Sequence, residues 1–404
     1  LIDVHKTGGV MLEGTKVLSF THYMQGPSAA QVLADLGAEV VKVEAPKGAF
    51  ERSWSGCNTY PGGVSMFFLL GNRNQTAISI NLKSPEGKKI IYELVKEYDV
   101  VIENFRAGVM EKLGLGYEDL RKVNPKLIYC SCSGYGSSGP YVDAKKPGQD
   151  LLIQSMSGLV SLTGSNPDIP SPVGTPIVDQ HGAVLAALGI TASILDRERT
   201  GKGHKVEASL LGSALDLQQE ALGYYMNGGQ FTERPSTGLS TRLHQSPYGV
   251  YQTKDGCLTL GATSVDKLQV MFTPGCMDGY TEEDQMFKRI EFDQIVCQEM
   301  KKKTTAEWMK IFDEHGIWYA PVNDYDTMLE DPQVKYNNNI LTMHHPVAGD
   351  VRVVGHANKY DGKNIEIRKL PPKLGESTQE ILKKLGYSEE TIKKYKENGI
   401  VNWE

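Results

Sequence analysis

The stretch KVLSFTHYMQGPSAAQVLADLGAEVVKVE, residues 16–44, decides the fold. It opens with an apolar run at 16–20 that is typical of a buried strand, and it closes with a second such run at 39–44. Between them, residues 27–37 repeat their apolar side chains at helical spacing. The stretch therefore predicts a strand–helix–strand unit, the building block of a parallel sheet.

The same alternation returns downstream. Residues 76–82 and 99–105 are strand-like, and the helix between them is expected to begin at Ser84 and Pro85, a good cap followed by a first-turn proline. A further strand is predicted at 126–132. We therefore predict an α/β fold whose large domain holds an open, mostly parallel, Rossmann-like sheet with helices on both faces.

A change of texture after residue 227 predicts a second, smaller domain. Residues 248–262, YGVYQTKDGCLTLGA, have the pattern of a β-hairpin with Asp255 and Gly256 at its turn. We expect residues 1–219 to form the first part of a large ligand-binding domain and residues 220–330 a small α+β domain. Residues 331–404 would return to the large domain and end in two short amphipathic helices.

Composition excludes several classes of protein. The net charge of −6, without a basic face, argues against a nucleic-acid partner. The six cysteines show neither CxxC pairs nor zinc spacing, so we expect free thiols, no metal and a reducing cytoplasm. Nothing resembles a signal peptide, and no apolar run reaches the length of a membrane span. A cytoplasmic protein without a membrane partner is the expectation.

In open parallel sheets ligands bind outside the carboxyl ends of the strands. This rule directs attention to the segments that follow Phe20, Asn104, Cys132 and Val178. The first of these turns has only Gly26 where a nicotinamide site would have three spaced glycines. The missing glycines argue against a nicotinamide dinucleotide site, although an anion could still bind to the helix start there.

Asp179 allows two interpretations. It precedes a long helical pattern in GTPIVDQHGAVLAALGITASILD, residues 174–196, where an aspartate would be a good N-cap. The local pattern favours the cap, and the alternative is that Asp179 performs the chemistry, because it follows an apolar segment at the expected sheet edge. The helix would bury one apolar stripe, made of Val184, Leu185, Leu188, Ile194 and Leu195.

Seven segments together resemble the class III CoA-transferase family, also called CaiB/BaiF, which includes the carnitine and bile-acid CoA-transferases. They run nearly end to end in matching order and spacing: 12–44, NLKSPEGKK (81–89), DVVIENFRAGVMEKLGLGYEDL (99–120), NPKLIYCSCSGYGSSGP (124–140), PIVDQHGAVLAALGI (176–190), TGKGHKVEASLL (200–211) and LPPKLGESTQEILKKLGY (370–387). The resemblance implies an enzyme that uses acyl-CoA and a free carboxylic acid as substrates, a large domain that binds CoA, and a homodimer of threaded chains.

The resemblance also implies the site residues. Asp179 matches the catalytic aspartate that carries the acyl group and then CoA as covalent intermediates. Backbone N–H groups at the start of the following helix could stabilise the oxyanions. The implied CoA contacts are His22, Tyr23, Met24, Lys83, Asn104, Phe105 and Lys112. From the residues alone, a structural role is favoured for His22, whereas Lys83 and Lys112 could equally be solvated surface lysines.

Two alternative functions stay open. The related α-methylacyl-CoA racemases use a Gly-His-Asp segment, but this chain has Gly148-Gln149-Asp150, and glutamine cannot exchange a proton at neutral pH. A non-catalytic acyl-CoA-binding protein would retain the fold and use Asp179 as a cap. Formyl-CoA transferases have a glycine run that residues 234–249 lack, which argues against formate and oxalate and leaves donor, acceptor and closing loop open.

Overall fold

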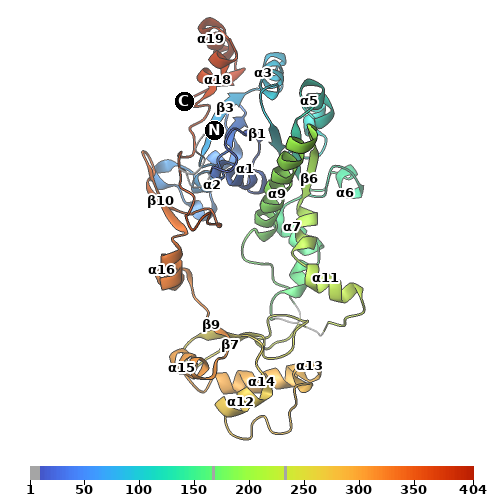
Figure 1. Ribbon diagram of the computed structural model, residues 1–404, viewed down its shortest axis with the longest axis vertical. Helices are drawn as coiled ribbons and strands as arrows, with labels where there is room; N and C mark the ends of the chain where they lie inside the picture. The colour runs from blue at the N-terminus through green and yellow to red at the C-terminus, as the bar shows by residue number, and fades with distance from the viewer. Residues whose placement is uncertain (1–9, 166–168, 232–233) are drawn as a thin grey trace. The chain divides into compact units, whose positions relative to one another are not determined.

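The structure is a computed structural model that describes residues 10–165, 169–231 and 234–404. Its main feature is a seven-stranded sheet in the order β12-β3-β2-β1-β4-β5-β6, which is parallel except for the pairing of β12 with β3. The predicted mostly parallel α/β sheet is confirmed (Figure 1). The strands are β1 (Lys16–Phe20), β2 (Glu39–Glu44), β3 (Gln75–Ile80), β4 (Val100–Glu103), β5 (Ile128–Ser133), β6 (Lys205–Ser209) and β12 (Val401–Asn402).

The chain divides into two compact units. The large unit comprises residues up to Asp150, Pro176–Ser213 and Gln333–Glu404, and the small unit comprises Leu151–Thr175 and Ala214–Pro332. These boundaries differ from the expected ones mainly in placing Leu151–Thr175 in the small unit. The chain therefore passes from the large unit to the small one and back twice.

Helices cover both faces of the large sheet. The large unit contains the helices α1 (Gln25–Asp35), α2 (Met66–Gly71), α3 (Pro85–Val95), α4 (Val109–Leu113), α5 (Tyr117–Val123), α6 (Pro140–Asp143), α9 (Ile177–Thr200), α18 (Thr378–Lys384) and α19 (Glu389–Glu397), with 3₁₀ turns at Phe50–Arg52, Gly56–Asn58 and Pro61–Gly63. A separate antiparallel pair joins β10 (Ile340–His345) to β11 (Gly349–Val354).

The small unit contains the predicted hairpin. Strands β7 (Gly249–Gln252) and β8 (Cys257–Leu260) pair antiparallel, and β9 (Tyr319–Pro321) adds to β8. Its helices are α8 (Leu159–Leu162), α11 (Gln219–Met226), α12 (Val265–Met271), α13 (Asp284–Phe287), α14 (Arg289–Met300), α15 (Thr305–His315) and α16 (Tyr325–Glu330), while α7 (Asp150–Met156), α10 (Leu210–Asp216) and α17 (Pro332–Asn337) lie at the unit boundaries.

The large core has two halves because successive strand residues point to opposite faces of the sheet. Leu18 packs in the half covered by α3, α5, α18 and α19, whereas Val17 packs in the half covered by α1 and α9. Cys130 and Cys132 share the second half, because they are alternate residues of one strand. Both thiols are buried and free, whereas Cys57 is exposed.

Helix α9 differs from its prediction in two ways. It begins at Ile177 rather than after Asp179, so the interpretation of Asp179 as the N-cap is wrong. The predicted apolar stripe is wrong in part: Val184, Leu188 and Leu195 are more than half exposed, whereas Ile194 packs against the core. The buried side of the helix is instead made of one valine at its start, its small residues and one isoleucine, namely Val178, Gly182, Ala183, Ala186, Ala187, Ile190 and Ser193.

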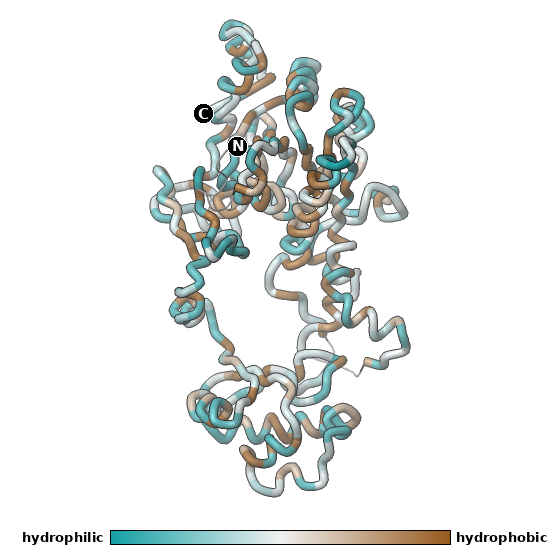
Figure 2. Tube along the Cα trace, in the orientation of Figure 1, coloured by the Kyte–Doolittle hydropathy of each residue, from teal (hydrophilic) through white to brown (hydrophobic). Residues whose placement is uncertain are grey.

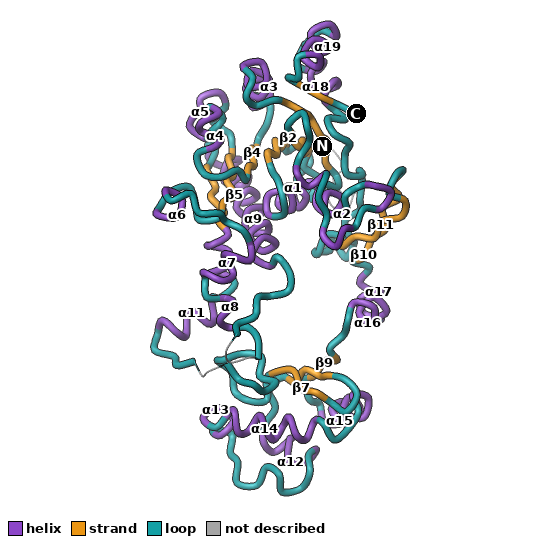
Figure 3. The backbone as a smooth tube through the Cα atoms, turned by 180° about the vertical axis from the view of Figure 1, so that it is seen from behind, coloured by secondary structure: helices purple, strands orange, loops and turns teal. Residues whose placement is uncertain are grey.

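The small side of α9 allows close packing on α1, which lies beside it from both viewpoints (Figures 1 and 3). The hydropathy colouring of Figure 2 shows how apolar α9 is along much of its length. Among the described helices it alone is long and apolar enough to cross a membrane, a test of length and composition that buried core helices also pass. Its packed face is that of a core helix in a folded domain.

Candidate active site

The order of the strands reverses between β1 and β4, which is where open α/β sheets bind their ligands. His22 follows β1 and Asn104 follows β4, and the two residues hold each other. The His22 amide donates to Asn104 Oδ1 at 2.7 Å, and Asn104 Nδ2 donates back to the His22 carbonyl at 2.7 Å. The Asn104 amide is therefore occupied in shaping the loop after β1.

The surroundings of His22 favour the neutral form of its ring. Burial and the nearby Lys42 ammonium lower its pKa, and the edge of the ring meets Phe105 with 4.9 Å between ring centroids. Lys42 is itself buried on β2, where its Nζ donates to the Thr21 carbonyl and to Glu51 Oε1, each at 2.9 Å. The buried ion pair of Lys42 and Glu51 thus supports the loop after β1.

An exposed row of aromatic side chains extends from this loop. Tyr23 has a φ of 59°, which is uncommon for a residue with a bulky side chain. Its ring lies 5.3 Å from that of Phe50, which is 6.1 Å from Trp54, which in turn meets Phe67 at 4.9 Å. Tyr23, Phe50 and Trp54 are all more than 40% exposed. This row is an apolar surface that begins in the predicted CoA loop.

The start of α1 connects this loop with α9. Gln25 is buried, and its Nε2 donates to the Ala208 carbonyl on β6 at 3.2 Å. A Cβ built on Gly182 of α9 would lie 2.7 Å from the same Nε2, so the two helices touch there. Because Gly182 is three residues beyond Asp179, the contact places the first turn of α9 beside the His22–Met24 loop. Met24 is partly buried, and its sulfur accepts from the Ser28 hydroxyl.

Asp179 lies in the first turn of α9, and Asp150 caps that helix. Asp150 Oδ2 accepts from the backbone amides of Val178 at 2.8 Å and Asp179 at 2.9 Å. Burial, and then the charge of Asp150, raise the pKa of Asp179 to about 7. A partly buried carboxyl group with a raised pKa is thus held next to the strand-order reversal.

The two predicted lysines lie apart from this group. Lys83 follows β3 and is exposed, and its backbone amide donates to Asn81 Oδ1. Lys112 is exposed in the last turn of α4. The structure therefore brings together Asp179, His22, Tyr23, Met24, Asn104 and Phe105, while Lys83 and Lys112 stay predicted phosphate contacts.

Two acidic residues near the site escaped sequence reasoning. Asp150 is only 7% exposed, holds the first turn of α9 through the Val178 and Asp179 amides, and adds to the effect of burial in raising the pKa of Asp179. Glu103 ends β4, accepts from the Phe105 amide at 2.9 Å, and has a pKa raised by burial to about 7. The sequence signal for Glu103 is a charged residue at the end of an otherwise apolar strand.

Across the described ranges, no three His, Cys, Asp or Glu residues gather as a metal site would require.

Known proteins share this architecture. The sequence signature of CoA-transferase family III matches residues 12–378. Succinyl-CoA:glutarate CoA-transferase of Mus musculus is 34% identical over 399 residues, covering 96% of this chain and 90% of the mouse protein. Formyl-CoA:oxalate CoA-transferase of Streptomyces avermitilis is 30% identical, covering 96% of this chain and 99% of the relative.

The crystal structure of a CaiB/BaiF family protein from Brucella suis superposes with a TM-score of 0.80 at 27% identity, covering 93% of this chain and all of that one. Fold and site together define a CoA-transferase. The chain belongs to CoA-transferase family III, the CaiB/BaiF family, as its sequence segments predicted.

Proposed function

We propose that this enzyme moves CoA from an acyl-CoA thioester to a free carboxylic acid through covalent intermediates on Asp179. The observation that carries the proposal is the position of Asp179: a partly buried carboxyl group in the first turn of α9, beside the loop at the strand-order reversal. The proposed chemistry needs a nucleophile, and a carboxylate can serve as one.

In the first half of the reaction, a carboxylate oxygen of Asp179 attacks the thioester carbonyl. The carbon–sulfur bond breaks, CoA leaves as the thiolate, and a mixed anhydride joins the donor acyl group to Asp179. The thiolate then attacks the Asp179 carbonyl carbon and expels the donor acid as its carboxylate. The product is an aspartyl-CoA thioester, and no proton has been consumed.

In the second half, the acceptor carboxylate attacks the Asp179 carbonyl carbon and releases the thiolate again. The resulting anhydride joins the acceptor to Asp179, and the thiolate takes the acceptor acyl group. Asp179 leaves as a free carboxylate, ready for another cycle. Water would hydrolyse every one of these intermediates, so the reaction requires a site that excludes it.

The expected oxyanion donors at the start of α9 need correction. The amides of Val178 and Asp179 are both bonded to Asp150 Oδ2 and cannot also bind an oxyanion. Asp150 instead fixes the first turn, and its charge disfavours the ionised form of Asp179. A raised pKa makes the Asp179 carboxylate more basic and, by general nucleophile behaviour, more reactive once it is ionised.

The acyl partners are proposed from the relatives and from the aromatic row. The mouse relative is named for succinyl-CoA and glutarate, so this pair is the first to test. The exposed surface of Tyr23, Phe50 and Trp54 would favour acids with an apolar or aromatic part over formate or oxalate. CoA itself would contact the loop of His22, Tyr23 and Met24, with Lys83 and Lys112 toward its phosphates.

A homodimer forms part of the proposal. The side of α9 away from the sheet carries Val184, Leu188 and Leu195, each more than half exposed in the single chain. A row of large apolar side chains on one helix face is costly in water and is typical of a subunit contact. A second copy of the chain would cover it.

The decisive experiment traps the intermediates on Asp179. The protein is incubated with succinyl-CoA and a panel of acyl-CoAs, quenched with hydroxylamine or borohydride, and its peptides are mapped by mass spectrometry. We expect a label on Asp179 that is absent in Asp179→Asn. The neighbouring Asp150→Asn variant, which retains Asp179, serves as the matched control and should still be labelled.

A CoA ester that binds without labelling Asp179 would exclude covalent transfer. Deuterium wash-in at the α-carbon of a 2-methylacyl-CoA in heavy water would then reveal a racemase, and its absence would leave a binding protein.

A further inference from the structure

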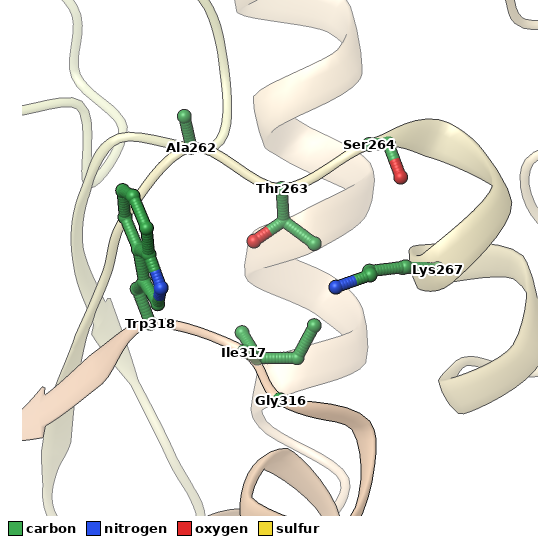
Figure 4. A pocket seen from close by; sticks show the side chains of 7 residues that line it. All are labelled: Ala262, Thr263, Ser264, Lys267, Gly316, Ile317 and Trp318. Carbon is green, nitrogen blue, oxygen red and sulfur yellow. The ribbon is translucent and has the colours of Figure 1, made fainter.

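The small unit contains a pocket that the proposed reaction does not use. It is lined by Ala262, Thr263, Ser264, Lys267, Gly316, Ile317 and Trp318, and its volume is about 300 Å³ (Figure 4). Trp318 stands on one side, and the Lys267 side chain enters from the other with its ammonium group directed inward. This small-unit pocket combines a flat apolar wall with a cation.

The backbone around the pocket is well fixed. The Thr263 carbonyl accepts from the buried Gln285 side chain at 2.7 Å, and the Gly261 amide donates to the Trp318 carbonyl at 2.8 Å. A Cβ on Gly261 would lie 3.1 Å from Trp318 Cβ, so glycine permits this close approach. The walls are therefore in place before any ligand arrives, which lowers the entropic cost of binding.

Trp318 is an unusually exposed tryptophan, with 77% of its surface accessible. By contrast, Trp308 in the same unit is fully buried. The Trp318 indole is exposed to water at the rim of a fixed pocket. Covering it with a flat apolar group would be favourable, because burial removes apolar surface from water and aromatic faces stack well on planar groups. The ligand should therefore have a planar part.

Two polar side chains of the pocket are available to a ligand. Ser264 occupies the N-cap position of α12, but its hydroxyl makes no capping bond, and the Val265 amide donates to Glu282 Oε1 at 3.0 Å instead. In the described part of the chain, no carboxylate lies within ion-pair distance of Lys267. A ligand carboxylate can accept from both the Lys267 ammonium and the Ser264 hydroxyl.

We infer that the small-unit pocket binds a small planar carboxylic acid, with its carboxylate on Lys267 and Ser264 and its flat part against Trp318. The volume lies at the lower end of the range for ligand pockets, which suits such an acid and is too small for a whole CoA molecule. The site belongs to the small unit alone, and the inference holds whether or not Asp179 forms covalent intermediates.

The test uses benzoate as the probe and needs no enzyme activity. The full chain is labelled with 5-fluorotryptophan, and its four tryptophans give four fluorine signals. Trp318→Phe assigns the signal of Trp318. We expect benzoate to shift that signal saturably, while the signal of buried Trp308 stays in place and reports that the fold is intact.

Charge is tested with a neutral isostere and two lysine variants. Benzamide should bind more weakly than benzoate, and Lys267→Met should weaken benzoate by roughly three- to tenfold. Lys310→Met, which alters another lysine of the same unit outside the pocket, should leave binding unchanged.

Three results would overturn the inference. The first is no benzoate-dependent shift at Trp318, and the second is equal binding of benzamide or an unaltered affinity in Lys267→Met. The third is tighter binding of adenosine monophosphate than of benzoate, which would make the pocket a nucleotide site.

Discussion

Two carboxyl groups, Asp150 and Asp179, determine how the proposed reaction depends on pH. The pKa of Asp179 is raised to about 7, first by burial and then by the charge of Asp150. Only the ionised form can attack a thioester. The rate constant kcat/KM should therefore rise as the pH increases through about 7 and level off above it.

Replacing Asp150 with asparagine should move this pH profile. The new side chain could still accept from the amides of Val178 and Asp179 through its carbonyl oxygen, but it has no charge to oppose ionisation of Asp179. We expect the rising limb of kcat/KM to shift toward lower pH by roughly one unit or less. A profile measured by initial rates would contradict this role if the limb kept its position or moved upward.

The same raised pKa has a cost for stability. A carboxyl group whose folded-state pKa is raised binds its proton more tightly in the native state, so stability falls as the pH rises from about 4 to about 7. Asp179→Asn should therefore stabilise the protein, little at pH 4 and by roughly 2–4 kcal/mol at pH 8. Urea unfolding of both proteins at the two pH values measures the difference. An equal change in the free energy of unfolding at pH 4 and pH 8 would show that burial does not destabilise the ionised form of Asp179.

At the scale of residues, sequence reasoning singled out Asp179 as the candidate nucleophile, which stays a prediction, and missed its hydrogen-bond partner Asp150. Asp179 was recognised by resemblance, whereas the local cap pattern suggested a structural role that is wrong. The helix is in fact capped from Asp150, which lies outside the helix and far back along the chain. A contact between distant segments leaves no trace in the spacing of either one.

At the scale of helices and strands, the packing of α1 against the loop that precedes it requires a glycine at position 26. A Cβ on Gly26 would lie 2.7 Å from Thr21 Cβ and 3.0 Å from Asn104 Cγ. Gly26→Ala should therefore destabilise the protein by about 1–3 kcal/mol, despite the better helix propensity of alanine. It should also raise KM for acyl-CoA, because it disturbs the loop that carries His22.

Gly223 of α11 provides the matched control, since a Cβ there would meet no atom within 4 Å. Gly223→Ala should stabilise the protein by about 0.5–1 kcal/mol and leave KM unchanged. Thermal unfolding and initial rates compare the two variants. If Gly26→Ala and Gly223→Ala changed stability alike, helix propensity, and not the close approach at Gly26, would determine the effect of both substitutions.

The strands were more predictable than the long helix. The expected boundaries of β1 and β2 match the structure, and Ser84 caps α3 by accepting from the Gly87 amide, as its sequence indicated. In α9 the large apolar residues suggested the buried face. The helix buries alanines instead, because close packing on α1 favours small side chains, and it leaves Val184 and Leu188 outside.

At the scale of the whole molecule, the exposed side of α9 tests the proposed dimer. Leu188→Asp places a charge at the centre of the predicted contact, on a side chain that is 62% exposed in the single chain and thus unneeded for folding. We expect sedimentation velocity to give twice the chain mass for the unaltered protein and the single mass for the variant. Val270→Asp, on a similarly exposed residue of the small unit, is the control and should sediment like the unaltered protein.

Whole-molecule features were the hardest to foresee. The mostly parallel sheet followed from repeated strand–helix units, and the return of the chain to the large domain followed from the change in texture. The inclusion of Leu151–Thr175 in the small unit did not, because a short excursion of helix and loop resembles any other connection.

The edge strand β12 gives the protein a particular problem during its synthesis. Val401 and Asn402 pair with Ile80 and Ser79, so the outer edge of β3 is covered by residues that a ribosome adds more than 300 positions later (Figure 1). At typical rates of about 5–20 residues per second, the nascent sheet waits on the order of tens of seconds with that edge bare. Bare edges invite pairing with other chains. Release of the chain before β12 has been synthesised would therefore give a product prone to aggregate.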